Sequence, residues 1–206
     1  MNDAVLDFIR ASIGADDVTG RSVLEVGSLD FNGSARTVLA QWNPATYVGV
    51  DMQEGKGVDR VLSVSYLVDT FGERAFDVVV STEMLEHVQD WRWAISQLKR
   101  STASSGRLVV TTRSPGFHYH GYPHDFWRFT EDDFRHIFSD MQDVVVASDQ
   151  SEPGVFVAAR RPIEFAELDL HGFEVGTSPE APPGPLWKHI NSSVRNRLRG
   201  LRRRLR

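Results

Sequence analysis

Residues 23–36 read Val-Leu-Glu-Val-Gly-Ser-Leu-Asp-Phe-Asn-Gly-Ser-Ala-Arg, and this stretch decides the fold. A short apolar run is followed by two glycines, Gly27 and Gly33, and then by residues that favour the start of a helix. Glycine at position 27 allows a sharp turn off the strand, and Gly33 allows the backbone to pass close to a ligand. The stretch therefore predicts a strand, a ligand-binding turn and a helix.

Two further segments end in a similar way. Residues 47–50 form a second apolar run that stops at Asp51. Residues 76–87 contain a third apolar run, which also ends in polar residues. In an open parallel sheet, ligands bind at the carboxyl ends of the strands. A carboxylate at position 51 is placed to accept hydrogen bonds from both hydroxyls of a ribose.

The glycine spacing argues against a phosphate-bearing ligand. The Gly-x-Gly-x-x-Gly pattern of dinucleotide sites is absent, and no Gly-Lys-Ser or Gly-Lys-Thr follows the turn. The carboxylates of Glu25 and Asp30 would repel a pyrophosphate. Together, the three segments resemble the class I S-adenosylmethionine (SAM) dependent methyltransferases, of the type 11-like, bacterial small-molecule or glycan branch. Their cofactor has no phosphate and carries a positive sulfonium.

Apolar runs that alternate with helix-like stretches predict an α/β fold with parallel strands joined by crossover helices. The resemblance implies a Rossmann-like, doubly wound sheet of seven strands, mostly parallel, with an antiparallel last hairpin. We expect strands at 22–26, 47–50, 60–62, 76–81, 107–112, 143–147 and 155–159, and helices at 2–13, 34–42, 88–100 and 131–138, the last capped by Thr130.

The chain divides into three parts. We expect the methyltransferase domain at 1–161, a proline-rich linker or arm at 162–185, and a basic amphipathic helix at 186–206. The absence of cysteine fits a reducing compartment, and the first residues resemble neither a signal peptide nor a membrane span, so the expected location is the cytoplasm.

The basic residues are concentrated in the tail. Residues 187–206 hold eight of the 23 lysines and arginines and no acid, which leaves 15 basic and 28 acidic residues, or −13, in the rest of the chain. Such a body would repel nucleic acid. An apolar stripe at helical spacing within 187–206 predicts peripheral contact with an anionic membrane, or docking on this protein or a second subunit.

The resemblance implies which residues contact the SAM cofactor. It assigns Met52 to the adenine, and it places Ser63 where many relatives have an aspartate for the adenine amine. The predicted cofactor-binding residues are Glu25, Gly27, Ser28, Gly33, Asp51, Met52, Ser63 and Glu83.

Residues 113–128 are too rich in aromatic and titratable side chains for a simple connector. The segment 126–130, Phe-Trp-Arg-Phe-Thr, resembles an insert of bacterial methyltransferases associated with surface glycans or secondary metabolites. We expect catalytic roles for His120 and His124, with His87 as a further candidate, and substrate contacts from Tyr119, Tyr122, Asp125, Trp127 and Arg128.

Each of these assignments has a structural alternative. Any single histidine could be a hydrogen-bonded structural side chain, Glu86 and His87 could cap the following helix, and Asp125 could pair with Arg128 to close the loop. His118, His120 and His124 have a spacing that permits a metal. We predict no metal, because the cation-dependent sugar methyltransferases use mainly carboxylates and other oxygens as ligands.

The histidines favour a hydroxyl acceptor over an amine. An alcohol attacks poorly until its proton leaves, and histidine has a suitable pKa for accepting it near neutral pH. The sequence predicts O-methylation of a sugar, glycolipid or cyclic metabolite by in-line transfer. The alternatives are an N-methyltransferase and a non-catalytic SAM-fold scaffold tethered by its tail. A nucleic-acid methyltransferase lacks an Asn-Pro-Pro-Tyr type of motif after the fourth strand.

Overall fold

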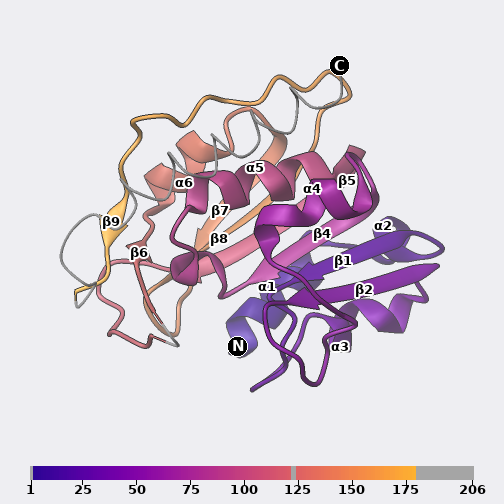
Figure 1. Cartoon of the computed structure of the whole chain (residues 1–206), viewed down its shortest axis with the longest axis horizontal. Helices are drawn as coiled ribbons and strands as arrows, with labels where there is room; N and C mark the ends of the chain where they lie inside the picture. The colour runs from indigo at the N-terminus through magenta and orange to yellow at the C-terminus, as the bar shows by residue number, and fades with distance from the viewer. Residues whose placement is uncertain (1, 122–123, 180–206) are drawn as a thin grey trace, which may run out of the picture.

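The computed structural model describes residues 2–121 and 124–179, and its centre is a seven-stranded sheet (Figure 1). The strand order is β3-β2-β1-β4-β5-β8-β7. The strands are β1 (Ser22–Val26), β2 (Thr46–Asp51), β3 (Arg60–Val61), β4 (Phe76–Thr82), β5 (Thr102–Arg113), β7 (Gln142–Ser148) and β8 (Gly154–Arg160).

Strands β3, β2, β1, β4 and β5 run parallel to their neighbours, whereas β8 is antiparallel to both β5 and β7. Only seven residues separate the predicted runs 143–147 and 155–159, and so short a link permits only a hairpin. The predicted Rossmann-like sheet with a closing antiparallel hairpin is confirmed.

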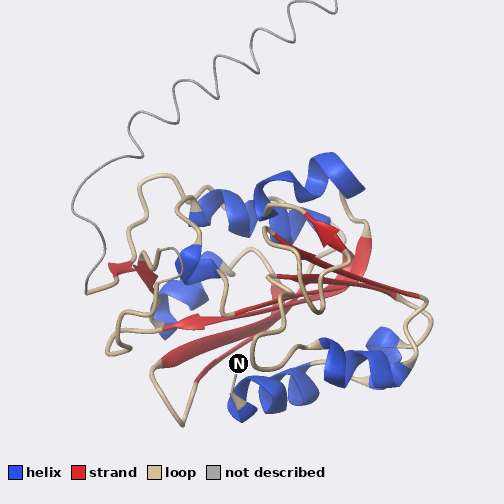
Figure 2. Ribbon diagram, turned by 60° about the horizontal axis from the view of Figure 1, so that its bottom comes forward, coloured by secondary structure: helices blue, strands red, loops and turns tan. Residues whose placement is uncertain are grey.

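Helices cover both faces of the sheet (Figure 2). One face packs against α1 (Asp3–Ser12), α2 (Ala15–Val18) and α3 (Arg36–Leu39), and the other against α4 (Leu67–Phe71), α5 (Trp91–Ser101) and α6 (Glu131–Ile137). In β4, Val78 and Val80 face the first layer and Val79 faces the second, because successive side chains of a strand alternate between faces. Near-continuous apolar runs are therefore what this sheet requires.

Three helical regions differ from the expectation. The predicted helix 34–42 is a single α-helical turn, α3, followed by the 3-10 turn η1 (Ala40–Trp42), which ends at Asn43 in the left-handed conformation. The predicted helix 88–100 begins only at Trp91, because Asp90 is its N-cap and accepts a hydrogen bond from the Trp93 amide. The short elements α2, η2 (Val64–Tyr66) and α4 were not predicted from the sequence. The N-cap predicted at Thr130 is confirmed.

Residues 161–179 cross the α5 and α6 layer and end beside the long loop that follows β5 (Figure 1). The Arg92 guanidinium donates to the carbonyls of Leu170 and Phe173, and the Phe173 ring stacks on His136. A second, two-stranded sheet pairs β6 (Trp127–Arg128) with β9 (Gly176–Thr177). Residues 161–179 thereby anchor the end of the loop that follows β5.

The predicted amphipathic helix 186–206 lies outside the described residues. Within the described part of the chain, no helix has the length and hydropathy needed to cross a bilayer.

Candidate active site

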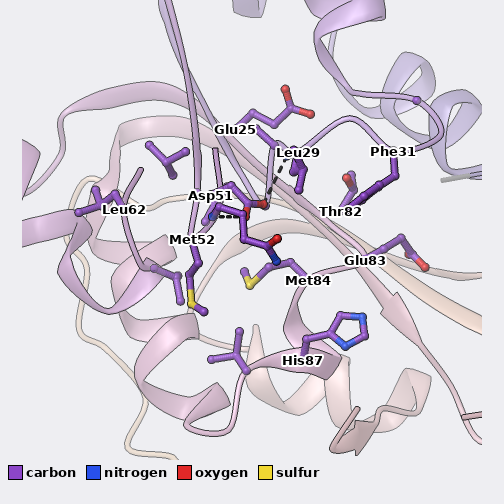
Figure 3. Close-up of a pocket in the computed structure, with 18 of the residues that line it drawn as sticks. Glu25, Leu29, Phe31, Asp51, Met52, Leu62, Thr82, Glu83, Met84 and His87 are labelled. Carbon is purple, nitrogen blue, oxygen red and sulfur yellow. Dashed lines mark hydrogen bonds between the residues drawn. The ribbon is translucent and has the colours of Figure 1, made fainter. Parts of the chain in front are cut away.

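A cavity of about 300 Å³ opens at the carboxyl ends of β1, β2 and β4 (Figure 3). This is the edge at which ligands bind in open parallel sheets, and the volume is typical of small-molecule sites. Of the predicted cofactor residues, Ser63 alone is not in its wall, and seven are: Glu25, Gly27, Ser28, Gly33, Asp51, Met52 and Glu83.

The turn after β1 depends on Gly27. Its φ of +78° lies in the left-handed region, and a Cβ atom built there would be 2.8 Å from the Cβ of Met84. The Gly27 and Ser28 amides both donate to the Val50 carbonyl, which fixes the turn to β2. Farther along, the Gly33 amide donates to Asp30 at 2.8 Å, so the loop closes on itself at the cavity wall.

We expect Gly27→Ala to weaken SAM binding. The left-handed backbone is strained by about 1–3 kcal/mol for a residue with a Cβ, and the contact with Met84 would displace the turn. Titration calorimetry with S-adenosylhomocysteine measures the effect. Gly20→Ala is the matched control, since Gly20 also has a positive φ but has open space around its Cβ position. Equal losses of affinity in both variants would contradict this role.

Glu25 holds the start of α3 in place. Its carboxylate is 1% exposed and accepts hydrogen bonds from the Ser34 hydroxyl, the Ala35 amide and the Tyr47 hydroxyl, at 2.7–3.0 Å. Burial raises the pKa of Glu25, although these three donors act in the opposite direction. Glu25 lines the cavity, and these three hydrogen bonds make it a support of the glycine turn.

Asp51 is the last residue of β2, and its carboxylate lines the cavity (Figure 3). It accepts hydrogen bonds from the Leu29 amide at 3.3 Å and from the Gln53 amide at 3.0 Å, one on each oxygen. Each carboxylate oxygen has a further lone pair. The two amides therefore orient the carboxylate and leave it able to accept hydrogen bonds from a vicinal diol.

The cavity suits a cationic nucleoside. Its described wall contains the carboxylates of Glu25, Asp51 and Glu83 and no lysine or arginine, which disfavours a phosphate and favours a sulfonium. Met52, Leu62 and Val64 add apolar surface beside Asp51, where an adenine ring would lie. Ser63 lies outside the wall and instead caps η2 by accepting a hydrogen bond from the Ser65 amide. These residues fit SAM.

Next to His87 of the cavity wall, Glu86 is a fully buried carboxylate in the 3-10 turn η3 (Leu85–His87). Its Oε2 accepts a hydrogen bond from the Thr112 hydroxyl at 2.7 Å. Its Oε1 is buried without a hydrogen-bond partner and faces two imidazoles, with His120 Nε2 at 3.5 Å and His87 Nε2 at 3.9 Å. Burial raises the pKa of Glu86, but His120, His87 and Thr112 outweigh it, and the pKa lies below its ordinary value.

His87 lies in the cavity wall beside Met84 (Figure 3). Its Nδ1 is 2.6 Å from the carbonyl oxygen of His124. A carbonyl only accepts, so Nδ1 bears the hydrogen and Nε2 of the neutral ring carries the lone pair. The alternative in which Glu86 and His87 cap the following helix is wrong, because Asp90 is the N-cap of α5.

His120 lies between two buried carboxylates. Its Nδ1 is 3.0 Å from Asp125, and its Nε2 faces Glu86. Burial lowers the pKa of His120, but Glu86 and Asp125 outweigh it and hold the pKa above its ordinary value. Asp125 also accepts two hydrogen bonds from the guanidinium of Arg128, at 2.5 and 2.7 Å, and its pKa falls to about 2.

Arg128 is a buried side chain that joins several parts of the loop after β5 through hydrogen bonds. Its guanidinium is 1% exposed and also donates to the carbonyls of His118 and Trp127 and to the Ser178 hydroxyl. The Asp125–Arg128 pair that the sequence offered as a structural alternative is thus present. It places His120 by fixing the backbone on both sides of it.

The ion pair between Glu83 and Arg113 was not predicted from the sequence. Burial and the nearby charge of Glu86 raise the pKa of Glu83 to about 7, although Arg113 and the Thr111 hydroxyl act in the opposite direction. Glu83 has a φ of +52°, a strained conformation for a residue with a Cβ. Strain of this kind is concentrated at functional sites. The signal was available, since Glu83 directly follows β4 and Arg113 ends the neighbouring β5.

The remaining predicted site residues are dispersed. His118 and His124 are exposed, and their rings lie against Phe117 and Phe126 respectively. Trp127 donates its indole N–H to the Val88 carbonyl and packs on the core, so it supports the loop from below. Tyr119 is half-buried next to Gly121, and Tyr122 is outside the described residues.

Comparison with known proteins identifies the family. Residues 2–143 match the model of a family described as a methyltransferase domain. Among solved structures, a SAM-dependent methyltransferase from Mesorhizobium loti aligns with a TM-score of 0.60 and 15% identity, over 77% of this chain and 98% of its own. One from Archaeoglobus fulgidus aligns at 0.57 and 15%, over 77% and 94%.

The Burkholderia thailandensis 1,6-didemethyltoxoflavin-N1-methyltransferase, solved with S-adenosylhomocysteine, aligns at 0.57 and 16%, over 78% of this chain and 80% of its own. No curated protein matches the sequence. The structures share the fold, and the family model covers well over half of the chain. The chain therefore belongs to the methyltransferase domain family, and the SAM-dependent methyltransferase that its sequence predicts is confirmed.

Proposed function

We propose that the protein transfers the methyl group of SAM to a hydroxyl oxygen of a sugar, glycolipid or similar cyclic metabolite. The observation that carries this proposal is the imidazole of His87 in the wall of the cofactor cavity, with its Nδ1 hydrogen committed to a carbonyl. A lone pair on Nε2 is then available to take a proton. An amine acceptor would need no such group.

Of the three histidines predicted as bases, His87 alone lines the cavity, and its Nε2 is 3.9 Å from Glu86 Oε1, farther than hydrogen-bond distance. His120 has a carboxylate facing each ring nitrogen, and His124 is exposed and contributes its backbone carbonyl to His87. In the transfer, the acceptor O–H bond breaks and its proton passes to His87. The oxygen bonds to the methyl carbon as the carbon–sulfur bond breaks, and S-adenosylhomocysteine leaves.

The acceptor class rests on the surface around the cavity mouth. Phe31 lines the cavity and is 76% exposed, so it offers apolar surface to a bound ring. Half-buried Tyr119 lies on the loop that also holds His120. A cyclic polyol combines such apolar faces with hydroxyls at its rim.

We expect His87→Gln to lower turnover of a hydroxyl acceptor at least about 100-fold while SAM binding stays intact, because general-base catalysis contributes 100-fold or more. The measurement is S-adenosylhomocysteine release with a panel of glycosides, phenols and amines. His118→Gln is the matched control, an exposed histidine of the same loop system. Methylation of amines alone would overturn the hydroxyl assignment, and full activity of the His87 variant would remove His87 as the base.

A further inference from the structure

We propose that Glu86, His87 and His120 form a binding site for one divalent transition-metal cation next to the cofactor cavity, whose wall includes His87. One ligand atom from each of the three residues lies within 4.8 Å of the other two, and Glu86 Oε1 is near Nε2 of both histidines. The sequence predicted no metal, and of the histidine triplet that it offered for one only His120 belongs to this group. The His118 ring centroid is 6.3 Å from that of His120, and His124 presents its backbone carbonyl to His87.

The buried carboxylate oxygen is the first argument. Glu86 Oε1 is fully buried and has no hydrogen-bond partner among the described residues. A buried charged oxygen that accepts no hydrogen bond is unfavourable, so such atoms are usually in ion pairs or coordinate metals. Here the atom faces the two imidazole nitrogens from the end of β4.

The second argument is the orientation of the two rings. His87 Nδ1 is fixed by the His124 carbonyl and His120 Nδ1 by the Asp125 carboxylate, at 2.6 and 3.0 Å. Metal-binding histidines are held in this way, with the nitrogen that does not bind the metal donating to a carbonyl or a carboxylate. In the neutral rings, Nε2 of each histidine is then able to bind a cation, and both Nε2 atoms lie near Glu86 Oε1.

The distances from the Glu86 oxygen to the two imidazole nitrogens also match those between metal ligands. Ligands at 2.0–2.2 Å from a tetrahedral zinc ion are about 3.4 Å apart. The Glu86 oxygen is 3.5 Å from His120 Nε2 and 3.9 Å from His87 Nε2. A proton can lie between only two of these three atoms, whereas a cation satisfies all of them. Two imidazoles and one carboxylate suit Zn²⁺ or Fe²⁺ better than Mg²⁺, which prefers oxygen ligands.

The chemical role of this cation rests on the proposed function and refines it. His87 lines the cavity, so a cation bound to it would have an open coordination position facing the acceptor. A hydroxyl bound there loses its proton more readily, and the cation takes over the activation that the metal-free geometry gives to His87. The O–H bond breaks, the proton passes to solvent water, and the oxygen bonds to the methyl carbon as before.

The test begins with metal binding and uses no acceptor. The full chain without a histidine tag is treated with EDTA, dialysed, and titrated with ZnCl₂ and separately with MgCl₂ by calorimetry. We expect one high-affinity Zn²⁺ per chain, much weaker Mg²⁺ binding, and a higher Tm with Zn²⁺. Glu86→Gln and His120→Ala should each weaken Zn²⁺ binding at least about tenfold, and His118→Ala should leave it unchanged.

The outcomes separate this inference from the proposed function. Absent Zn²⁺ binding, or binding that persists unchanged in both ligand variants, overturns the metal site. Glu86→Gln keeps the shape of the side chain, and S-adenosylhomocysteine binding shows that the variant is folded. An independent readout is the visible absorption of the Co²⁺-loaded protein, which should be lost in His120→Ala. Metal binding without methylation of any hydroxyl supports the site and overturns the proposed acceptor.

Discussion

Arg128→Met is expected to lower the free energy of unfolding by about 3–5 kcal/mol, because removal of one partner leaves the other charge buried and uncompensated. The Asp125 carboxylate is fully buried and accepts two hydrogen bonds from Arg128. Among the described residues, His120 is the only other group that forms an ion pair with it. Urea unfolding followed by circular dichroism measures the loss. The loop that carries His120 should also become accessible to protease.

A double variant separates the lost ion pair from lost packing. Arg128→Met combined with Asp125→Leu removes both buried charges, and it should recover most of the stability lost in Arg128→Met. Arg135→Met is the matched control, since Arg135 is half-exposed on α6 and its ion pairs with Glu131 and Asp132 are on the surface. Such pairs contribute about 0–1 kcal/mol. A loss at Arg128 no larger than at Arg135 would contradict the role of the buried pair.

Asp51→Ala is expected to raise the Kd for S-adenosylhomocysteine by about 100- to 10,000-fold. Two hydrogen bonds from a ribose diol to one carboxylate contribute about 1.5–3 kcal/mol each, and alanine removes both. The Leu29 and Gln53 amides that orient the carboxylate would also lose their acceptor. Titration calorimetry gives the Kd directly.

The control for this prediction is Asp69→Ala, an exposed aspartate of α4 that is not in the cavity wall. It should bind S-adenosylhomocysteine as the unchanged protein does. Asp51 is at the end of a strand and half-exposed, so its replacement leaves the core intact and the variant folded. Unaltered affinity in Asp51→Ala would mean that the nucleoside does not bind at the end of β2.

The sheet and the cofactor end of the site were predictable because their signals are local. Apolar runs define the strands, and a glycine or a carboxylate at the end of a run lies at one edge of a parallel sheet. Gly27 and Asp51 could therefore be placed together before any contact was known. The length of α3 was not predictable, because a left-handed Asn43 and tertiary packing end the helix early.

The sequence by itself determined the Rossmann-like sheet, the glycine turn and the Asp51 carboxylate at the end of the second strand. Only the tertiary structure brought Glu86 and His87 against His120, which is more than thirty positions away in a loop without regular spacing. That contact depends on the buried Asp125–Arg128 pair and on β9, which pairs with β6 from a segment about fifty residues later. Such long-range packing is absent from any periodicity, and it decides which imidazoles face the cavity.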